Sequence, residues 1–326
     1  MTWLQVNHEP VLIAELKAGL EAALYEIDSD LKVTNSTGIR GWNEDNIKTN
    51  KLAHHAIDHW DVPILHTWYR YGQFVPAQEI RPSSLEPKPL SEANLPDSTE
   101  LQRRGYPNAE EYKGYFLEHD IAHILEQGWF EFLRENYKEY APTAYRQIYL
   151  ANLGILELLE ELAGAQNPVE RADEYYEEFK DYSVDLRAGI ASNSRFDAET
   201  EEHVRRGIHT IQDILLSLST RGEDIDDKSA VFRSRNIYHT YIWRWPAFII
   251  SKEQARGIDR DNFSQEGQER LENIKGSCES RLRDLREEVV DSELKPTGND
   301  YRQVHGSSQD TLLSLDEALT GSQQDE

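Results

Sequence analysis

Hydrophobic residues recur along this chain at the three- and four-residue spacings of amphipathic α-helices. The first such series is Leu12, Leu16, Leu20 and Leu24. Pro10 precedes it at a position that suits a first helical turn, so we predict a helix over residues 11–27. A second series, which includes Ile47 and Leu52, predicts a helix that ends near Trp60.

After the second helix the pattern changes to that of a β element. Residues 62–75 contain the strand formers Thr67 and Tyr69, and Gly72 marks a turn or a bulge. Five prolines then fall within residues 76–96. This density of proline predicts an extended connector.

Beyond the connector the hydrophobic spacing is helical almost throughout. The predicted helices span residues 110–137, 144–162, 169–189, 198–219, 228–251 and 264–294. Pro246 is expected to kink or end the fifth of these helices. From Lys295 onward the chain is polar, and we expect disorder there.

The last predicted helix, residues 264–294, is mostly charged and carries a thin hydrophobic stripe. The stripe consists of Leu271, Ile274, Leu282, Leu285 and Val289. A narrow stripe on a long charged helix suits pairing with another helix or a coiled coil. It therefore offers a contact for a protein partner, including a second copy of this chain.

Charge sets the solvent in which the chain is expected to fold. Sixty acidic residues face 35 basic ones, which gives a formal net charge of -25. Such a charge strains a folded chain through self-repulsion at ordinary salt. Because the Debye length falls to about 3 Å in molar salt, we interpret this as a protein of a halophile.

Several classes of site and location are excluded by what the sequence lacks. The single cysteine, Cys278, leaves no internal disulfide and no cysteine-based zinc site. No signal peptide and no membrane-spanning run are recognised, so we expect a cytoplasmic protein. Phosphate-binding loops and nucleophile elbows are also missing, and we expect no cofactor.

Histidines are spaced four apart in two places. His55 and His59 share a face of the second predicted helix, where two ligands can meet one metal. His119 and His123 repeat that spacing.

The string over residues 117–123 resembles the His-Asp motif of HD-type metal phosphohydrolases. The resemblance implies that His119 and Asp120, with His123 nearby, bind a metal that activates water. That family also needs an earlier histidine, for which His66 is the nearest candidate, and a later aspartate such as Asp185. The alternative is that His119 and His123 edge a seam between helices.

A second resemblance covers the first quarter of the chain. A Lys-x-x-Lys-Leu pattern occupies residues 48–52, and an aromatic turn occupies residues 68–76. On these motifs residues 8–80 resemble the Panacea (SocA-like) family, although Gln73 replaces a common proline and residues 54–55 replace aromatic ones. The resemblance implies a winged-helix-like domain of the kind found in antitoxins and in a proteolytic adaptor.

The aromatic turn can also be interpreted from its residues alone, without the resemblance. Its residues are Trp68, Tyr69, Arg70, Tyr71 and Phe74. Such a cluster is either a packing nucleus or a recognition surface, because Trp, Tyr and Arg dominate interface hot spots.

A basic and aromatic run follows at residues 233–245. Its basic residues Arg233, Arg235 and Arg244 suit contact with a nucleic-acid backbone. The alternative is a core face, since Tyr238 and Trp245 share one side of the predicted helix.

Together these patterns predict a mainly α fold with a small β element. The expected segments are a winged-helix-like unit (1–80), a connector (81–96), a helical domain (97–252), a charged helix (253–294) and a disordered tail (295–326). We expect a non-catalytic regulatory, antitoxin-like or adaptor protein that binds a protein partner. A sequence-specific DNA-binding regulator and a metal-dependent phosphohydrolase are the alternatives.

Overall fold

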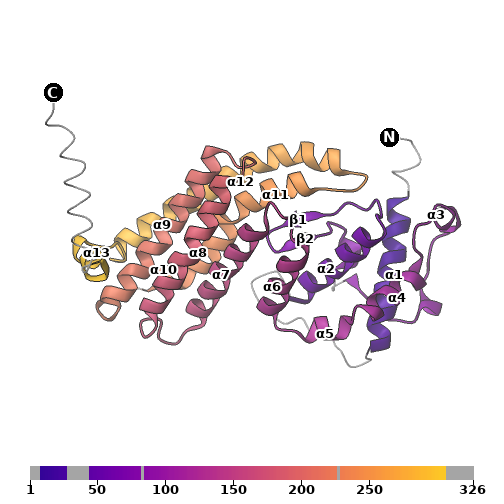
Figure 1. Cartoon of the computed structure of the whole chain (residues 1–326), viewed down its shortest axis with the longest axis horizontal. Coiled ribbons are helices and arrows are strands. Elements are labelled where there is room, and N and C mark those ends of the chain that lie inside the picture. The colour runs from indigo at the N-terminus through magenta and orange to yellow at the C-terminus, as the bar shows by residue number, and fades with distance from the viewer. Residues whose placement is uncertain (1–7, 28–43, 82–83, 226–227, 306–326) are drawn as a thin grey trace. The chain divides into compact units, whose positions relative to one another are not determined.

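The computed structural model describes residues 8–27, 44–81, 84–225 and 228–305 of the chain (Figure 1). The fold is mainly helical with one small sheet in the described part, as the sequence predicts. None of the helices in these ranges combines the length and the apolar character that crossing a membrane requires. The polar segment 28–40 and the tail beyond residue 305 lie outside the described residues.

The chain divides into two compact units. Unit 1 comprises Met1–Leu150 and Arg244–Lys275, and unit 2 comprises Ala151–Trp243 and Gly276–Glu326. This division cuts across the segments predicted from the sequence, because the chain leaves unit 1 and later returns to it.

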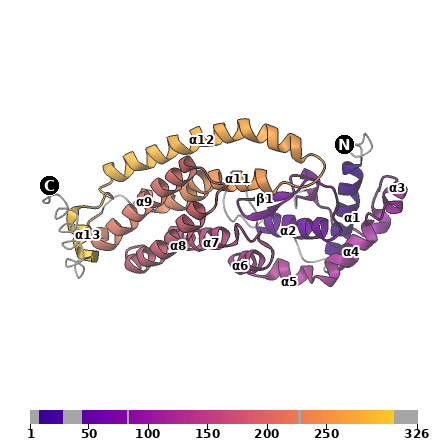
Figure 2. The same ribbon diagram turned by 45° about the horizontal axis from the view of Figure 1, so that its top comes forward.

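In unit 1, helix α1 (Glu9–Ile27) lies against α4 (Ala109–Glu118) (Figures 1 and 2). The leucines spaced four apart on α1 are buried, as their pattern predicts. Glu15 is buried as well, and its Oε2 accepts a hydrogen bond of 2.8 Å from the backbone N–H of Ala109. This bond satisfies a free N–H group at the start of α4.

Helix α2 (Glu44–His59) leads to a hairpin of β1 (Thr67–Tyr69) and β2 (Gly72–Phe74), which pair antiparallel. This hairpin is the small β element expected from the sequence. Gly72 has φ +89°, and a Cβ there would lie 2.7 Å from Cε1 of Tyr137. Glycine is therefore required at this turn. The winged-helix likeness of residues 1–80 stays a prediction.

The connector is less extended than predicted. It contains short 3₁₀ turns at Gln78–Ile80 (η1) and Leu90–Glu92 (η3), and helix α3 (Thr99–Arg103) follows.

The single helix predicted over residues 110–137 is wrong. The chain instead forms α4, α5 (Ile121–Glu126) and α6 (Trp129–Tyr140). The first break falls at Asp120, which has a left-handed φ of 48° and caps α5 by accepting the N–H of His123. The break does show in the hydrophobic spacing, because the buried Ile121 comes five residues after Phe116 and nine after Tyr112, on the opposite side of a continuous helix.

Unit 2 contains most of α7 (Arg146–Gly164), with α8 (Ala172–Ser192), α9 (Ala198–Arg221) and α10 (Ser229–Ile237). Helices α8 and α9 pack along each other (Figures 1 and 2). The side chain of Asp197 caps α9 by accepting the N–H of Thr200 at 2.8 Å. The hydrophobic face predicted for this helix is buried.

The helix predicted over residues 228–251 is interrupted before Pro246. A π-helical turn, Tyr238–Ile242 (η5), follows α10, and α11 (Arg244–Gln254) begins after it. Pro246 therefore stands in the first turn of α11, where the missing N–H costs little. The carbonyl of Tyr241 faces Nε2 of His203 at 2.9 Å.

Helix α12 (Arg260–Asp291) carries the predicted stripe, but the chain itself covers it. Leu271, Ile274, Leu282, Leu285 and Val289 are each at most 7% exposed. The stripe is therefore not a free surface for a homodimer, and that prediction is corrected.

The expected disorder from Lys295 is wrong for the first part of the tail. Residues Gly298–His305 form α13. Oδ2 of Asp300 accepts the N–H of Thr297 at 2.6 Å, and Oδ1 lies 3.0 Å from Nε of Arg221 on α9. These contacts attach α13 to α9 within unit 2.

Candidate metal centre

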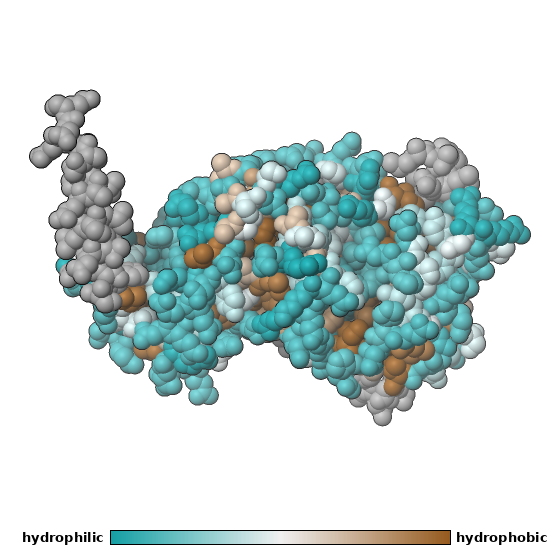
Figure 3. Space-filling model, in the orientation of Figure 1, coloured by the Kyte–Doolittle hydropathy of each residue, from teal (hydrophilic) through white to brown (hydrophobic). Residues whose placement is uncertain are grey.

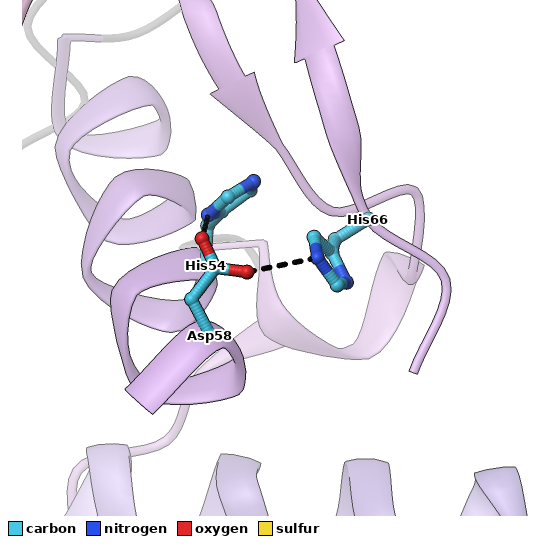
Figure 4. Close-up of side chains that lie close together, drawn as sticks. All are labelled: His54, Asp58 and His66. Atoms are coloured by element: carbon cyan, nitrogen blue, oxygen red, sulfur yellow. Dashed lines mark ion pairs between the residues drawn. The ribbon is translucent and has the colours of Figure 1, made fainter. Parts of the chain in front are cut away.

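Two histidines and an aspartate converge beside the hairpin of unit 1 (Figure 4). His54 and Asp58 stand one turn apart on α2, and His66 precedes β1. One ligand atom from each lies within 4.8 Å of the other two. Nδ1 of His54 is 3.2 Å from Oδ2 of Asp58, and Nε2 of His66 is 3.0 Å from Oδ1. Ligands of a tetrahedral ion with bonds of about 2.0 Å are separated by about 3.3 Å; each histidine–carboxylate spacing is close to this value, with the two rings facing different oxygens of Asp58.

His66 meets an oxygen at each ring nitrogen. Its Nδ1 is 2.9 Å from the carbonyl oxygen of Ile64, and its Nε2 faces Asp58. Both oxygens are acceptors, whereas a neutral imidazole carries a single N–H. The arrangement therefore requires a second proton on His66 or a cation at Nε2. Donation of one ring N–H to a backbone carbonyl is the usual way in which a metal-binding histidine is oriented.

His54 lies at the back of the cluster and is 2% exposed. Burial lowers its pKa, and the neighbouring Asp58 offsets this only in part. The ring therefore remains neutral at physiological pH, which is the form that binds metals. Its Nε2 has no hydrogen-bond partner among the described residues, whereas its Nδ1 faces the carboxylate of Asp58.

Asp58 joins the two histidines and reaches solvent. Burial alone would raise the pKa of its carboxyl group, but the facing imidazoles of His54 and His66 outweigh burial and lower that pKa. The carboxylate is therefore ionised at neutral pH. A neutral ring, an ionised carboxylate and a ring that requires a positive partner form a suitable donor set for a divalent ion.

An open polar cleft of about 490 Å³ lies in front of the cluster. Asp58 and His66 form part of its wall, while Arg256, Arg260 and Tyr106 contribute to the rest. A ligand in this cleft would thus meet both the carboxylate–imidazole group and two guanidinium groups.

The backbone fixes Arg256 beside His66. The two residues form an antiparallel bridge, with N–H···O distances of 3.1 and 2.9 Å in the two directions. Residues paired in this way project side chains from the same side of the bridge. Gly257 follows with φ +100°, and a Cβ there would lie 2.4 Å from the carbonyl oxygen of Ile64. Glycine is required for the segment to lie this close to the chain before β1.

The sequence pointed to α2 as a source of metal ligands spaced four residues apart, but the pair that it selected is one residue away from the pair in the cluster. His55 and His59 do not form the metal group; His54 and Asp58 do. Nε2 of His55 lies 3.0 Å from Oε1 of Gln73, and His59 packs on the rings of Trp60 and Tyr115. His66, chosen as the earlier histidine of the HD-type motif, is in the cluster, but with different companions.

His119, Asp120 and His123 are exposed and do not join a three-residue metal group in the described part of the chain. Nδ1 of His119 contacts the carbonyl oxygen of Tyr115, and its ring stacks on that tyrosine with centroids 3.9 Å apart. Asp120 is occupied as the cap of α5. The HD-type assignment to these residues stays a prediction that this geometry does not favour.

The aromatic turn lies mostly inside the molecule. Trp68 and Tyr71 are each 5% exposed, and Trp68 packs on Tyr149. Tyr69, Arg70 and Phe74 are partly exposed. The lysines of the Lys-x-x-Lys-Leu pattern have structural partners: Nζ of Lys48 donates to the carbonyls of Leu125 and Gln127, and Lys51 donates to that of Tyr71.

The basic residues proposed for nucleic acid already have acidic partners in two cases. Arg233 pairs with Glu288, and Arg235 pairs with Glu160. Arg244 is partly buried at the start of α11. Of the aromatic residues of the same run, Tyr238, Trp243 and Trp245 are buried, and Tyr241 is partly exposed. Nucleic-acid contact through this run stays a prediction.

Comparison with known proteins identifies the family of this chain but supplies no activity. Residues 1–320 match the family described as Domain of unknown function (DUF8098), and the chain belongs to that family. No curated protein and no solved structure matches the chain.

Proposed function

We propose that this member of the DUF8098 family is a metal-dependent hydrolase with a divalent ion bound by His54, Asp58 and His66. The observation that carries the proposal is His66, which lies between two acceptor oxygens and needs a cation or a second proton at Nε2. Three protein ligands that border an open cleft leave a position for water, as in catalytic zinc sites.

The three residues of the cluster then have distinct roles around the ion. An ion bound there supplies Lewis acidity and lowers the pKa of a bound water towards neutrality. The carbonyl of Ile64 orients His66, and burial keeps His54 neutral and fixed. The carboxylate of Asp58 contributes a negative charge, which favours the binding of a divalent cation beside the two imidazoles.

The cleft favours an anionic substrate. Arg256 and Arg260 line it, and Arg256 is held next to the ligand His66 by the backbone bridge. A guanidinium group binds planar or tetrahedral oxyanions through paired N–H donors. A phosphoester is therefore the first substrate class to examine. This proposal shares a reaction class and His66 with the HD-type alternative, but it replaces His119 and Asp120 by His54 and Asp58.

Zinc titration of the metal-free protein by calorimetry tests the proposal. We expect one ion per chain, with affinity reduced at least about 100-fold in Asp58→Asn and in His66→Gln, because each removes a ligand. His123→Gln is the matched control, since it changes an exposed histidine of the same unit.

Activity is measured on the same variants with bis(p-nitrophenyl) phosphate in the presence of zinc or manganese. Turnover that depends on metal and is lost in Asp58→Asn supports the proposal. No zinc binding in the folded protein, together with a doubly protonated His66 by NMR, contradicts it and identifies the cluster as a structural charge network.

Protein-partner recognition is the second candidate, and the partly exposed edge of the hairpin favours it. We infer that an adaptor or antitoxin role would use Tyr69, Arg70 and Phe74, because Trp68 and Tyr71 are core residues. Alanine at Tyr69 or Phe74 should weaken binding to a protein encoded beside this gene, measured by calorimetry. Unchanged affinity in folded variants removes this candidate.

A further inference from the structure

A second cavity in unit 1, of about 200 Å³, is separate in its lining from the metal cleft. Helices α2, α4, α5 and α6 contribute its walls. The ends of α5 are well fixed, because Asp120 caps its start and Lys48 donates to the carbonyls of Leu125 and Gln127 at its end. The cavity is thus bounded by a segment whose position is set by specific bonds.

A buried amide lines this cavity. Asn136 on α6 is 4% exposed, and its Oδ1 has no hydrogen-bond partner among the described residues. Its Nδ2 lies 3.2 Å from Nε2 of His55, which is also 3.0 Å from Oε1 of Gln73. A neutral ring nitrogen either donates or accepts, so His55 cannot satisfy both amides. Whichever amide His55 bonds to, Oδ1 of Asn136 has no partner among the described residues, and a buried acceptor without one is costly unless a ligand supplies a donor.

The charged groups of the lining are acidic. Glu135 and Glu139 line the cavity, and no lysine or arginine of the described part does. Glu135 is held in place by Gln127, whose Nε2 donates to its Oε2 at 2.7 Å. The ammonium of Lys48 donates to backbone carbonyls and lies 5.9 Å from the ring centroid of Phe132, which lines the cavity.

Aromatic rings complete the walls. His55 packs on Tyr140 and His119 stacks on Tyr115, with centroids 3.9 Å apart in both pairs. Aromatic faces attract organic cations, and carboxylates nearby add to that attraction.

We propose that this cavity binds a small organic cation that carries N–H donors, such as an amidinium or guanidinium group. One N–H bonds to Oδ1 of Asn136, the positive charge faces Glu135 and Glu139, and the planar group packs between the aromatic rings. The site does not depend on the metal centre, and it gives His119 and His123 a place in a binding wall.

Benzamidinium is the probe, with benzamide and benzoate as neutral and anionic compounds of nearly the same shape. Binding to the full chain is followed by calorimetry and by NMR of the histidine rings, at the lowest KCl concentration that keeps the chain folded. We expect benzamidinium to bind saturably, benzamide more weakly, and benzoate not to bind.

Glu135→Gln combined with Glu139→Gln should weaken benzamidinium about tenfold, because two nearby charges are removed. Glu131→Gln, an exposed glutamate of α6 outside the lining, is the matched control and should change nothing. Asn136→Leu should also weaken binding, with its melting temperature recorded to separate unfolding from loss of the acceptor.

The proposal is overturned if benzamidinium shows no saturable binding, if benzoate binds equally well, or if Glu131→Gln has the same effect as the double variant. These outcomes are independent of zinc binding, so failure here leaves the metal proposal standing.

Discussion

Lys51 is a charged residue wholly enclosed by the core of unit 1. It is 0% exposed, and its Nζ donates to the carbonyl oxygen of Tyr71 at the turn of the hairpin. Burial lowers the pKa of this amino group from 10.5 to about 7. Lys51 thus supports the turn of the hairpin through this hydrogen bond, while its burial disfavours the charged form of the amino group.

We predict that Lys51 makes stability depend on pH above neutrality. Between pH 7 and 10.5 the unfolded chain holds a proton at this residue that the folded chain has lost. The unfolding free energy should therefore rise with pH, by up to about 1.4 kcal/mol per unit. Urea unfolding from pH 7 to 9 checks this. The range stops below the ordinary tyrosine pKa of 10.0. Burial raises the pKa of Tyr137 and Tyr149, so these two residues would lower the unfolding free energy above pH 10.0.

Lys51→Met is the comparison. It should remove the rise, although it also leaves the Tyr71 carbonyl without this donor. An equal rise in both proteins would place the titrating group elsewhere.

Single residues of the candidate centre were only partly predictable. The sequence pointed to paired histidines on the second helix and to His66, yet it selected His55 and His59. Spacing shows that two side chains share a face but not which face meets the hairpin, because that depends on how β1 packs. Asp58 was missed because acidic residues are dense throughout the chain. Its signal was the His-x-x-x-Asp spacing, which places both groups on one side of a helix.

At the scale of elements, breaks in helices were harder to predict than the helices themselves. The hydrophobic faces of α1, α8 and α9 follow directly from their spacing. The break at Asp120 was missed, although Ile121 falls out of the helical register of Tyr112 and Phe116 and was its signal. Helix α13 did have a signal: Thr297 and Asp300 stand three apart, as in a capping box, and Asp300 bonds back to Thr297.

Asp120 provides a prediction at this scale. Asp120→Ala should destabilise the chain by about 1–2 kcal/mol, because it removes the cap of α5 and leaves a strained left-handed residue. Asp120→Asn should stay within about 0.5 kcal/mol, since asparagine caps helices and tolerates this conformation. Denaturant unfolding measures both variants.

The same variants separate the two metal assignments. If His54, Asp58 and His66 hold the ion, Asp120→Ala retains zinc affinity. Loss of zinc from the folded variant would restore the HD-type assignment.

For the whole molecule, charge dominates the surface. The net charge is -25, and hydrophilic residues cover most of the face drawn in Figure 3. Many acidic residues pair locally with arginine, as Glu202 does with Arg205 at 2.7 Å, but such exposed pairs contribute little. The excess of like charge is left to the solvent. Helix content was predictable at this scale, whereas the division into two units was not, because both α7 and α12 run from one unit into the other.

We predict that added KCl stabilises the protein. The melting temperature should rise most steeply below about 1 M, where the Debye length shrinks from about 10 Å to about 3 Å. Scanning calorimetry between 0.1 and 2 M KCl checks this, with sucrose as a control for effects that do not involve charge. A melting temperature that does not change with KCl would remove the halophile interpretation.

The metal centre is tested most directly by anomalous diffraction at the zinc edge from crystals grown with zinc. The account predicts one strong peak about 2 Å from the ligand atoms of His54, Asp58 and His66. A peak beside His119 and His123, or none at the cluster while zinc is bound elsewhere, would contradict it.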